Sequence, residues 1–266
     1  MPIANQVAAT THLTRWHSLC LPLLLAAALS SGCGAGAKQQ ETLKQADFHY
    51  QMGTNHFTAG ETAQAIRELT LALELVPQHA DAHHLLGFLY LGRMQYPEAV
   101  RHFRAALDTN PDLFTCKNNL GVAYLYMERW EDAAAVYEDL RRATLYTSPW
   151  LAYANLGWAY YKMGRLQEAI EETKMALFLN PEMCLAANNL GIIYADLQLE
   201  NEAFESFKEA ISACPNYAEP HLHIGRLYGS LGNSQRAVSH FRKCVELSPR
   251  SDLGHRCRNN IDLYRN

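Results

Sequence analysis

Residues 184–217 read CLAANNLGIIYADLQLENEAFESFKEAISACPNY, and they carry the clearest copy of the pattern from which the fold is predicted. Gly191 is followed three residues later by Tyr194, and residues at this spacing lie on one face of a helix. Phe207 marks the inner face of a second helix, and Pro215 ends that helix because proline lacks a backbone N–H. The stretch therefore predicts two helices joined by a short turn.

The same pattern recurs along the chain at intervals of 34, 34, 36, 34 and 34 residues, marked by Gly53, Gly87, Gly121, Gly157, Gly191 and Gly225. Each glycine is followed twelve residues later by alanine, and five are followed twenty-four residues later by proline. A glycine costs a helix about 1 kcal/mol relative to alanine, so its recurrence indicates close packing of helix backbones. The pattern resembles the tetratricopeptide repeat, which implies an all-α, right-handed superhelical solenoid of six helix pairs.

The register divides the chain into segments. With each glycine set at position 8, the repeats occupy residues 46–251, and the helices of the repeat quoted above are expected over 184–198 and 200–213. Residues 252–266 continue the phase as one more helix, from Leu253 to Leu263, which is polar on one side. Such a helix suits a cap over the exposed apolar edge of the last repeat.

Residues 1–32 are expected to be a signal peptide, and the resemblance at their end makes it that of a lipoprotein. An apolar run from Leu19 to Leu29 is too short to span a bilayer but suits a signal-peptide core. The sequence that follows it, up to Cys33, resembles the bacterial lipobox, although Ser30 stands where leucine is commonest. The alternative is an ordinary secretory signal with a coincidental cysteine.

The lipobox resemblance implies that Cys33 is lipidated and that residues 33–45 form a flexible tether. Two acyl chains on Cys33 would give stable membrane anchoring. Gly34 in place of Asp after the lipidated cysteine favours the outer membrane, by resemblance to Gram-negative sorting. We therefore expect a lipid-anchored protein on the periplasmic face of the outer membrane.

Charge and motif content argue against several function classes. Removing the signal takes away Arg15 and no acid, so the whole-chain excess of four negative charges becomes five, which argues against nucleic-acid binding. The chain has no glycine-rich phosphate loop and no nucleophile motif, so we expect no enzyme, cofactor or small-molecule substrate. His49, His83 and His221 all fall at position 4 of their repeats, a half-exposed site, so a metal site is not expected.

Five cysteines follow Cys33, and export would place them in an oxidising compartment. Antiparallel helices bring Cys184 and Cys214 to the same end of one repeat, and Cys257 lies in the cap that packs on Cys244. We therefore predict disulfides Cys184–Cys214 and Cys244–Cys257, with Cys116 left free. The alternative is that all five are small buried side chains.

The first helix of each repeat supplies the concave surface of such a solenoid. Family resemblance places positions 2, 5, 9, 12 and 13 there, which gives a mostly apolar strip: Phe88, Leu91, Val122, Leu125, Tyr126, Trp158, Tyr161 and Ile192. One interpretation is a groove for a partner's helix or extended segment. The alternative is that several of these side chains pack within the solenoid.

Residues 143–157 carry a more specific resemblance. They read ATLYTSPWLAYANLG, similar to a Thr-Leu-Tyr-Pro stretch that leads into Asn-Leu-Gly in the type IV pilus pilotin family, the PilF/PilW/Tgl-like lipoproteins. Two residues separate Tyr146 from Pro149 here, more than in that family. The cysteines of the second half are most similar to the Tgl branch.

This resemblance implies a non-catalytic outer-membrane lipoprotein that binds secretin subunits. It would promote their assembly into the ring through which type IV pili pass, and so serve twitching or gliding motility. Trp158 and Phe88 would be the main anchors, because large aromatic side chains dominate interface energetics. The alternative is a periplasmic lipoprotein scaffold that recruits cell-wall hydrolases or proteases.

Overall fold

The computed structural model describes residues 26–264, with side chains from Gly36 onward, and this part of the chain is helical without strands. The helices are α1 Ala26–Thr58, α2 Thr62–Leu75, α3 Ala80–Gly92, α4 Tyr96–Thr109, α5 Phe114–Tyr126, α6 Trp130–Leu140, α7 Pro149–Lys162, α8 Leu166–Leu179, α9 Cys184–Asp196, α10 Glu200–Ala213, α11 Glu219–Ser230, α12 Ser234–Leu247 and α13 Asp252–Tyr264. Helices α1 to α12 form six consecutive pairs, and α13 packs on α12. The predicted all-α solenoid with six repeats is confirmed.

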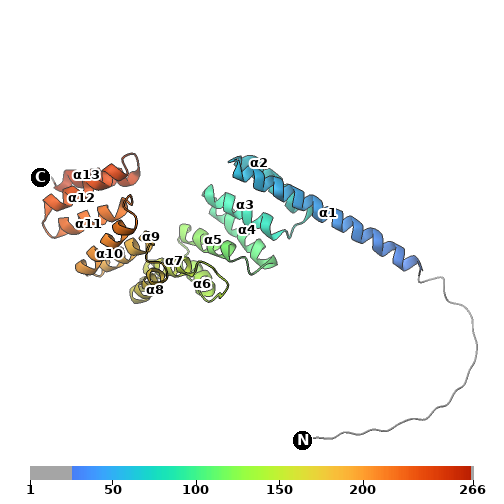
Figure 1. Cartoon of the computed structure of the whole chain (residues 1–266), viewed down its shortest axis with the longest axis horizontal. Coiled ribbons are helices and arrows are strands. Elements are labelled where there is room, and N and C mark those ends of the chain that lie inside the picture. Colours follow the sequence, from blue (N-terminus) through green and yellow to red (C-terminus); the bar gives the residue numbers. More distant parts are fainter. Residues whose placement is uncertain (1–25, 265–266) are drawn as a thin grey trace, which may run out of the picture.

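The solenoid is curved, with the first helix of each pair (the A helices) on the inside. Successive A helices touch one another along the described chain, whereas no two successive second helices (the B helices) do. Figure 1 shows the resulting arc, with α5, α7 and α9 nearer its hollow side than α6, α8 and α10. The A helices therefore line the concave surface, as the register predicts.

The six recurrent glycines allow each A helix to contact its B helix closely. A β-carbon added to Gly87, Gly191 or Gly225 would lie 2.5 Å from the ring of Phe103, Phe207 or Phe241, respectively. Gly121 faces Tyr137 in the same way, whereas the atypical repeats use Leu69 against Gly53 and Thr173 against Gly157. The glycines are conserved along the chain's own repeats because a larger residue would displace these buried side chains.

In every repeat, the turn from the A helix to the B helix contains one residue with a left-handed backbone conformation, that is, a positive φ. Gly60, Gly164 and Gly232 fill this place in three repeats. Met94, Glu128 and Gln198 fill it in the others, with φ between 56° and 59°. Such a backbone costs a non-glycine residue about 1–2 kcal/mol, so three of the six turns carry some strain.

The C-terminal end of the solenoid is cross-linked. The structure joins Cys184 to Cys214, with Cα atoms 5.8 Å apart, and Cys244 to Cys257, with Cα atoms 6.2 Å apart. These are the two pairs that the sequence predicts. Cys116 is free and buried. The second disulfide holds α13 against the last repeat, in the place expected for a capping helix.

The N-terminal segment differs from the sequence prediction of a flexible tether. From Gly36 to Gln45 the chain is part of α1, and its side chains are almost all exposed. Once residues 46–58 form a helix against α2, the Ala, Lys, Gln and Glu residues before them extend it at little cost. No helix in the described residues is long and apolar enough to cross a bilayer. Residues 1–25 and the side chain of Cys33 lie outside what is described, so the signal peptide and lipidation stay predictions.

Candidate protein-binding groove

The concave surface of the first three repeats is hollowed and apolar. One depression of about 430 Å³ lies among α1, α3 and α5, and its lining includes Phe57, Leu85 and Phe88. The rings of Phe57 and Phe88 meet edge to face, with centroids 5.7 Å apart. Phe88 remains 42% exposed, so part of its ring is free to contact another molecule.

A second depression of about 350 Å³ adjoins the first and shares Phe88 with it. Its lining includes Leu91, Met94, Val122 and Tyr126. Tyr126 is 63% exposed and stacks on Tyr96, with ring centroids 5.3 Å apart. Two large rings are therefore held in place at the surface without being covered.

A third depression of about 380 Å³ also adjoins the first, with which it shares His84 and Thr115. One wall is the segment between α6 and α7, which contributes residues 145–148. Leu145 is mostly exposed, whereas the Tyr146 ring packs near that of Phe114, 6.2 Å away between centroids. The three linked depressions are called the groove below.

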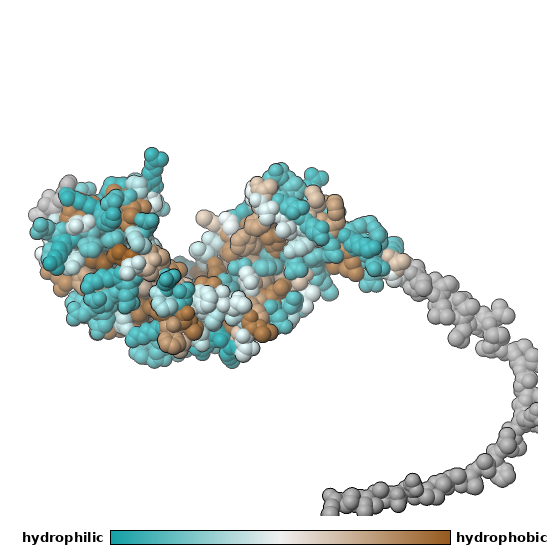
Figure 2. Space-filling view, in the orientation of Figure 1, coloured by the Kyte–Doolittle hydropathy of each residue, from teal (hydrophilic) through white to brown (hydrophobic). Residues whose placement is uncertain are grey.

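Figure 2 shows apolar residues gathered on the surface of the α1–α5 half, beside the hollow between the two halves of the arc. Charge is sparse in the groove itself: the only charged side chains in its lining are Asp81 and Asp112. His84 is neutral, because burial lowers its pKa, and its Nε2 accepts a hydrogen bond of 3.4 Å from the Asn119 amide. An apolar polypeptide segment fits such a surface better than a charged one.

The structure divides the residues that the sequence predicts for the groove. Phe88, Leu91, Val122 and Tyr126 line it together. Leu125 and Ile192 are half-buried and pack against the core of the solenoid, and Leu91 does so in part. These three side chains therefore agree largely with the alternative interpretation, in which the residues of the strip pack within the solenoid.

Trp158 and Tyr161 form a separate aromatic pair on α7, with ring centroids 5.0 Å apart. The Tyr161 hydroxyl donates a 2.6 Å hydrogen bond to Asp196 of the next repeat, and burial together with this bond raises the pKa of Tyr161 to about 12. Lys162 Nζ lies 5.9 Å from the Trp158 ring. Trp158 is not part of the groove lining, so Phe88 is the better placed of the two expected anchors.

The sequence interpretation missed several lining residues. Phe57 stands at the same repeat position as Leu91, so the register could have included it had the strip been extended to the first repeat. Met94 and Tyr96 lie in and after the turn between α3 and α4. No rule about helix A positions marks them, because they lie outside the A helices, and Tyr96 reaches the groove by stacking on Tyr126 of the next repeat.

The described residues offer little chemistry besides binding. No group of three or more His, Cys, Asp or Glu side chains within them is placed to hold a metal ion. Burial raises the pKa of the Cys116 thiol to about 12, so it stays protonated and unreactive at neutral pH. His221 is buried rather than half-exposed, and its Nδ1 lies 3.1 Å from that of His240.

Family models agree with this architecture. Models of the tetratricopeptide repeat match residues 50–113, 113–143, 150–183, 186–217 and 218–251, which together make up most of the chain. The chain belongs to the tetratricopeptide repeat family. No curated protein matches it in a sequence search.

Solved structures show how widely this solenoid is used, since 414 chains match it. PilW, described as a widely conserved type IV pilus biogenesis factor, is 22% identical over 79% of this chain and 96% of its own, with a TM-score of 0.70. PilF of Pseudomonas aeruginosa is 23% identical over 84% of this chain and 99% of its own, with a TM-score of 0.66. YrrB, described as having an unusual peptide-binding site, is 20% identical over 72% and 97%, with a TM-score of 0.50. At these identities the likeness shows the fold alone.

Proposed function

We propose that the protein is a pilotin, a lipoprotein that binds secretin subunits in the groove and promotes their assembly for type IV pilus biogenesis. The observation that carries this proposal is the groove itself, three adjoining and nearly uncharged depressions with partly exposed aromatic rings. A membrane-destined secretin subunit exposes apolar segments before it assembles. A groove of this kind covers such a segment and releases it without any catalytic step.

The energetics suit a reversible binder. Covering one large apolar side chain contributes about 1.5–3 kcal/mol, and a few such contacts dominate most protein interfaces. Phe88 and Tyr126 are already fixed by ring contacts with Phe57 and Tyr96, so binding costs them little side-chain entropy. Two or three anchors of this quality give a complex that is stable yet able to dissociate.

Two further observations support a pilotin over other repeat proteins. PilW and PilF align with this chain over 96% and 99% of their own length, so the likeness extends to nearly the whole of each protein. The stretch that resembles the pilotin family, residues 143–157, contributes one wall of the groove through Leu145 and Tyr146. The segment with the most specific sequence resemblance is therefore part of the candidate binding surface.

The proposal includes anchoring to the outer membrane through lipidated Cys33. The first repeat begins a few turns of helix after this residue, so the lipid would hold the groove close to the membrane surface. Palmitate labelling of the expressed protein would test the anchor. Label that persists in Cys33→Ala would contradict it, as would recovery of the unmodified chain in the soluble fraction.

The groove is tested by a matched pair of aromatic substitutions. Phe88→Asp places a charge in the groove, whereas Phe178→Asp changes an 80% exposed ring at the end of α8, outside the groove. We expect Phe88→Asp to lower secretin co-purification and heat-stable secretin multimers at least tenfold, with Phe178→Asp near wild type. Trp158→Ala should have a smaller effect than Phe88→Asp.

Normal multimer levels in cells that produce only Phe88→Asp would rule out this use of the groove. Capture of a cell-wall hydrolase or a protease, lost in Phe88→Asp while secretin levels stay normal, would instead support the scaffold alternative. Both results come from the same purification of the lipidated protein, so one experiment separates the two functions.

A further inference from the structure

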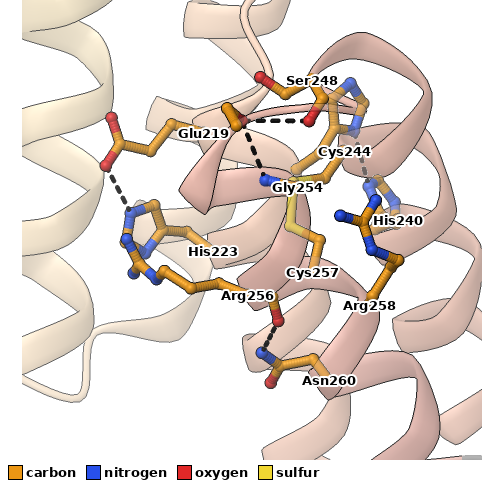
Figure 3. Close-up of a disulfide and its surroundings, with 12 residues drawn as sticks. Glu219, His223, His240, Cys244, Ser248, Gly254, Arg256, Cys257, Arg258 and Asn260 are labelled. Atoms are coloured by element: carbon orange, nitrogen blue, oxygen red, sulfur yellow. Dashed lines mark hydrogen bonds and ion pairs between the residues drawn. A yellow bond between two sulfur atoms is a disulfide. The ribbon is translucent and has the colours of Figure 1, made fainter.

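The two disulfides of the described chain differ in how far solvent reaches them. Cys244 and Cys257 are fully buried, and Figure 3 shows their bond between α12 and α13, beneath the turn that carries Gly254. Cys184 and Cys214 are both partly exposed. Thiol–disulfide exchange begins with the attack of a thiolate on a sulfur atom, so the partly exposed pair is open to a reaction from which the buried pair is shielded.

An open depression lies beside the partly exposed disulfide. Its volume is about 480 Å³, and its lining comes from the segments that precede the two cysteines: Leu177, Pro181, Glu182, Glu209, Ser212 and Ala213. Glu182 stands two residues before Cys184, and Ala213 stands directly before Cys214. Leu185, the residue after Cys184, is 48% exposed. The surface beside this disulfide can therefore hold part of another molecule while its reacting atom approaches a sulfur.

The two helix ends decide which sulfur is the better leaving group. Cys184 is the first residue of α9, and no side chain caps this end of the helix. Cys214 stands directly after the last residue of α10. Backbone N–H groups at a helix N-terminus stabilise a thiolate, whereas the carbonyl groups at a C-terminus destabilise one. Attack at Cys214 therefore releases the more stable thiolate, that of Cys184, and a more stable thiolate leaves faster.

The buried disulfide lacks this arrangement. Cys244 lies in the last turn of α12, and Cys257 lies in the middle of α13, so neither sulfur is at a helix N-terminus. Both belong to an apolar cluster, which disfavours a charged sulfur. Access and thiolate stability thus favour reaction at the same disulfide.

The charge of the depression selects the kind of thiol that reacts there. Glu182 and Glu209 have exposed side chains, and neither carboxylate forms an ion pair with another described residue. Two carboxylates repel an anionic thiol such as glutathione and attract a thiol that is flanked by cationic side chains.

We propose that Cys184–Cys214 is a thiol–disulfide exchange site, which is reduced by a dithiol protein with cationic side chains beside its reactive cysteine. This inference goes beyond the proposed function and does not depend on it. The partner's thiolate bonds to Cys214 Sγ as the disulfide breaks, and the released Cys184 thiolate takes a proton from water. The partner's second thiol loses its proton and displaces Cys214, which is protonated in turn, and the partner leaves as a disulfide.

Two electrons and two protons pass to this chain in the complete reaction. The cross-link between the start of α9 and the end of α10 is lost, whereas the disulfide that holds the capping helix stays closed. The reaction therefore loosens repeat 5 and leaves the end of the solenoid locked.

The test uses two blocked dithiol peptides, Lys-Cys-Gly-Pro-Cys-Lys and Glu-Cys-Gly-Pro-Cys-Glu, and the full chain in detergent with both disulfides formed. The reaction is stopped with acid, free thiols are alkylated after denaturation, and mass spectrometry gives the rate at which each cysteine is released. Cys116, which is free from the start, is the internal standard. Glu182→Gln with Glu209→Gln is the test variant, and Glu202→Gln, at the other end of α10, is the matched control.

We expect the lysine peptide to reduce Cys184–Cys214 about tenfold faster, or more, than Cys244–Cys257. The ratio of the rates with the lysine and glutamate peptides should fall about threefold or more in the test variant and stay unchanged in Glu202→Gln. Intrinsic differences in peptide reactivity cancel, because every protein meets the same two peptides. Equal rates at the two disulfides, or a ratio that the test variant leaves unchanged, would overturn the proposal.

A peptide with one cysteine, Lys-Cys-Gly-Pro-Ser-Lys, locates the sulfur that is attacked. It should be recovered in a mixed disulfide with Cys214, with Cys184 as the alkylated thiol. Recovery mainly on Cys184 would overturn the proposed order of steps.

Discussion

Repeats 1–3 and repeat 6 with its cap share one backbone arrangement but present different concave surfaces. In both regions a glycine of the A helix meets an aromatic ring of the B helix, as Gly87 meets Phe103 and Gly225 meets Phe241. The first region is hollowed, apolar and free of disulfides in its described part, whereas the second carries exposed arginines and a buried disulfide. Close contact between the two helices of a repeat constrains the packing positions, whereas the residues on the hollow side are free to differ between repeats.

The largest expected effect concerns the cross-linked end. Cys244→Ser with Cys257→Ser opens a short loop and should cost about 2–4 kcal/mol of unfolding free energy, because the unfolded chain regains freedom. Contacts in a solenoid are local, so the loss should be confined to α11–α13 and should leave repeats 1–3 protected.

Hydrogen exchange of each helix in wild type and the double variant measures this difference. Uniform loss of protection from α1 to α13 would show that the two regions unfold as one unit, which would break the comparison. The same measurement on Cys184→Ser with Cys214→Ser shows how far each cross-link acts along the solenoid.

The second effect tests whether packing is equivalent in the two regions. Gly87→Ala and Gly225→Ala each place a β-carbon 2.5 Å from a buried phenylalanine ring, so both should destabilise by about 1–3 kcal/mol. Gly92→Ala is the control, because nothing lies within 4 Å of a β-carbon there. Chemical denaturation gives the free energies, and a Gly87→Ala protein as stable as Gly92→Ala would contradict the close-packing account.

The third effect is a dependence on pH that both regions share. His83 and His102 in repeat 2, and His221 and His240 in repeat 6, form pairs with Nδ1 atoms 2.9 Å and 3.1 Å apart. Burial is the largest cause that lowers the pKa of His102 and of His221 to about 4, followed by nearby cationic or imidazole groups. Unfolded histidine titrates near pH 6.5, so between about pH 6.5 and 4 the unfolded chain binds more protons than the folded one.

Stability should therefore be complete above about pH 6.5 and fall as the pH drops toward 4. We expect the midpoint of thermal unfolding to fall by several degrees between pH 7 and 5, and less in His102→Gln with His221→Gln. Because the disulfides hold the C-terminal region, acid should open repeat 2 before repeat 6. A midpoint that is constant over this range would argue against the buried neutral pairs.

The smallest effect concerns the strained turns. Gln198→Gly removes a non-glycine residue with φ of 59° and should stabilise the protein by about 1 kcal/mol. Gly232→Ala, at the equivalent turn with φ of 73°, should destabilise it by a similar amount. Thermal unfolding of both variants measures the two changes in stability. If both substitutions stabilised the protein, or both destabilised it, backbone strain at the turns would not explain the difference between these repeats.

Much of the fold could be predicted because the repeat period imposes helical phase on every segment. Helix α10 begins at Glu200 and ends at Ala213, as predicted, since Pro215 and the preceding turn leave the chain no way to continue the helix. The tether was mispredicted because composition alone does not show that α1 extends backward from a packed helix. Trp158 lies outside the groove lining, and its role as an anchor stays a prediction, because the register indicates which side of the solenoid a residue faces but not how deep the surface is there.

The period, the pairing of helices and the cysteines that meet all follow from the sequence alone, because each depends on contacts within one repeat or between neighbours. The positions at which the hollow side becomes a groove, and the approach of Met94 and Tyr96 to it from a turn, emerge only in the folded solenoid. The groove depends on how far each surface side chain is left uncovered by its neighbours, which the repeat register does not specify. A small rotation at each interface is not encoded in any single repeat, so it appears only when the whole solenoid is assembled.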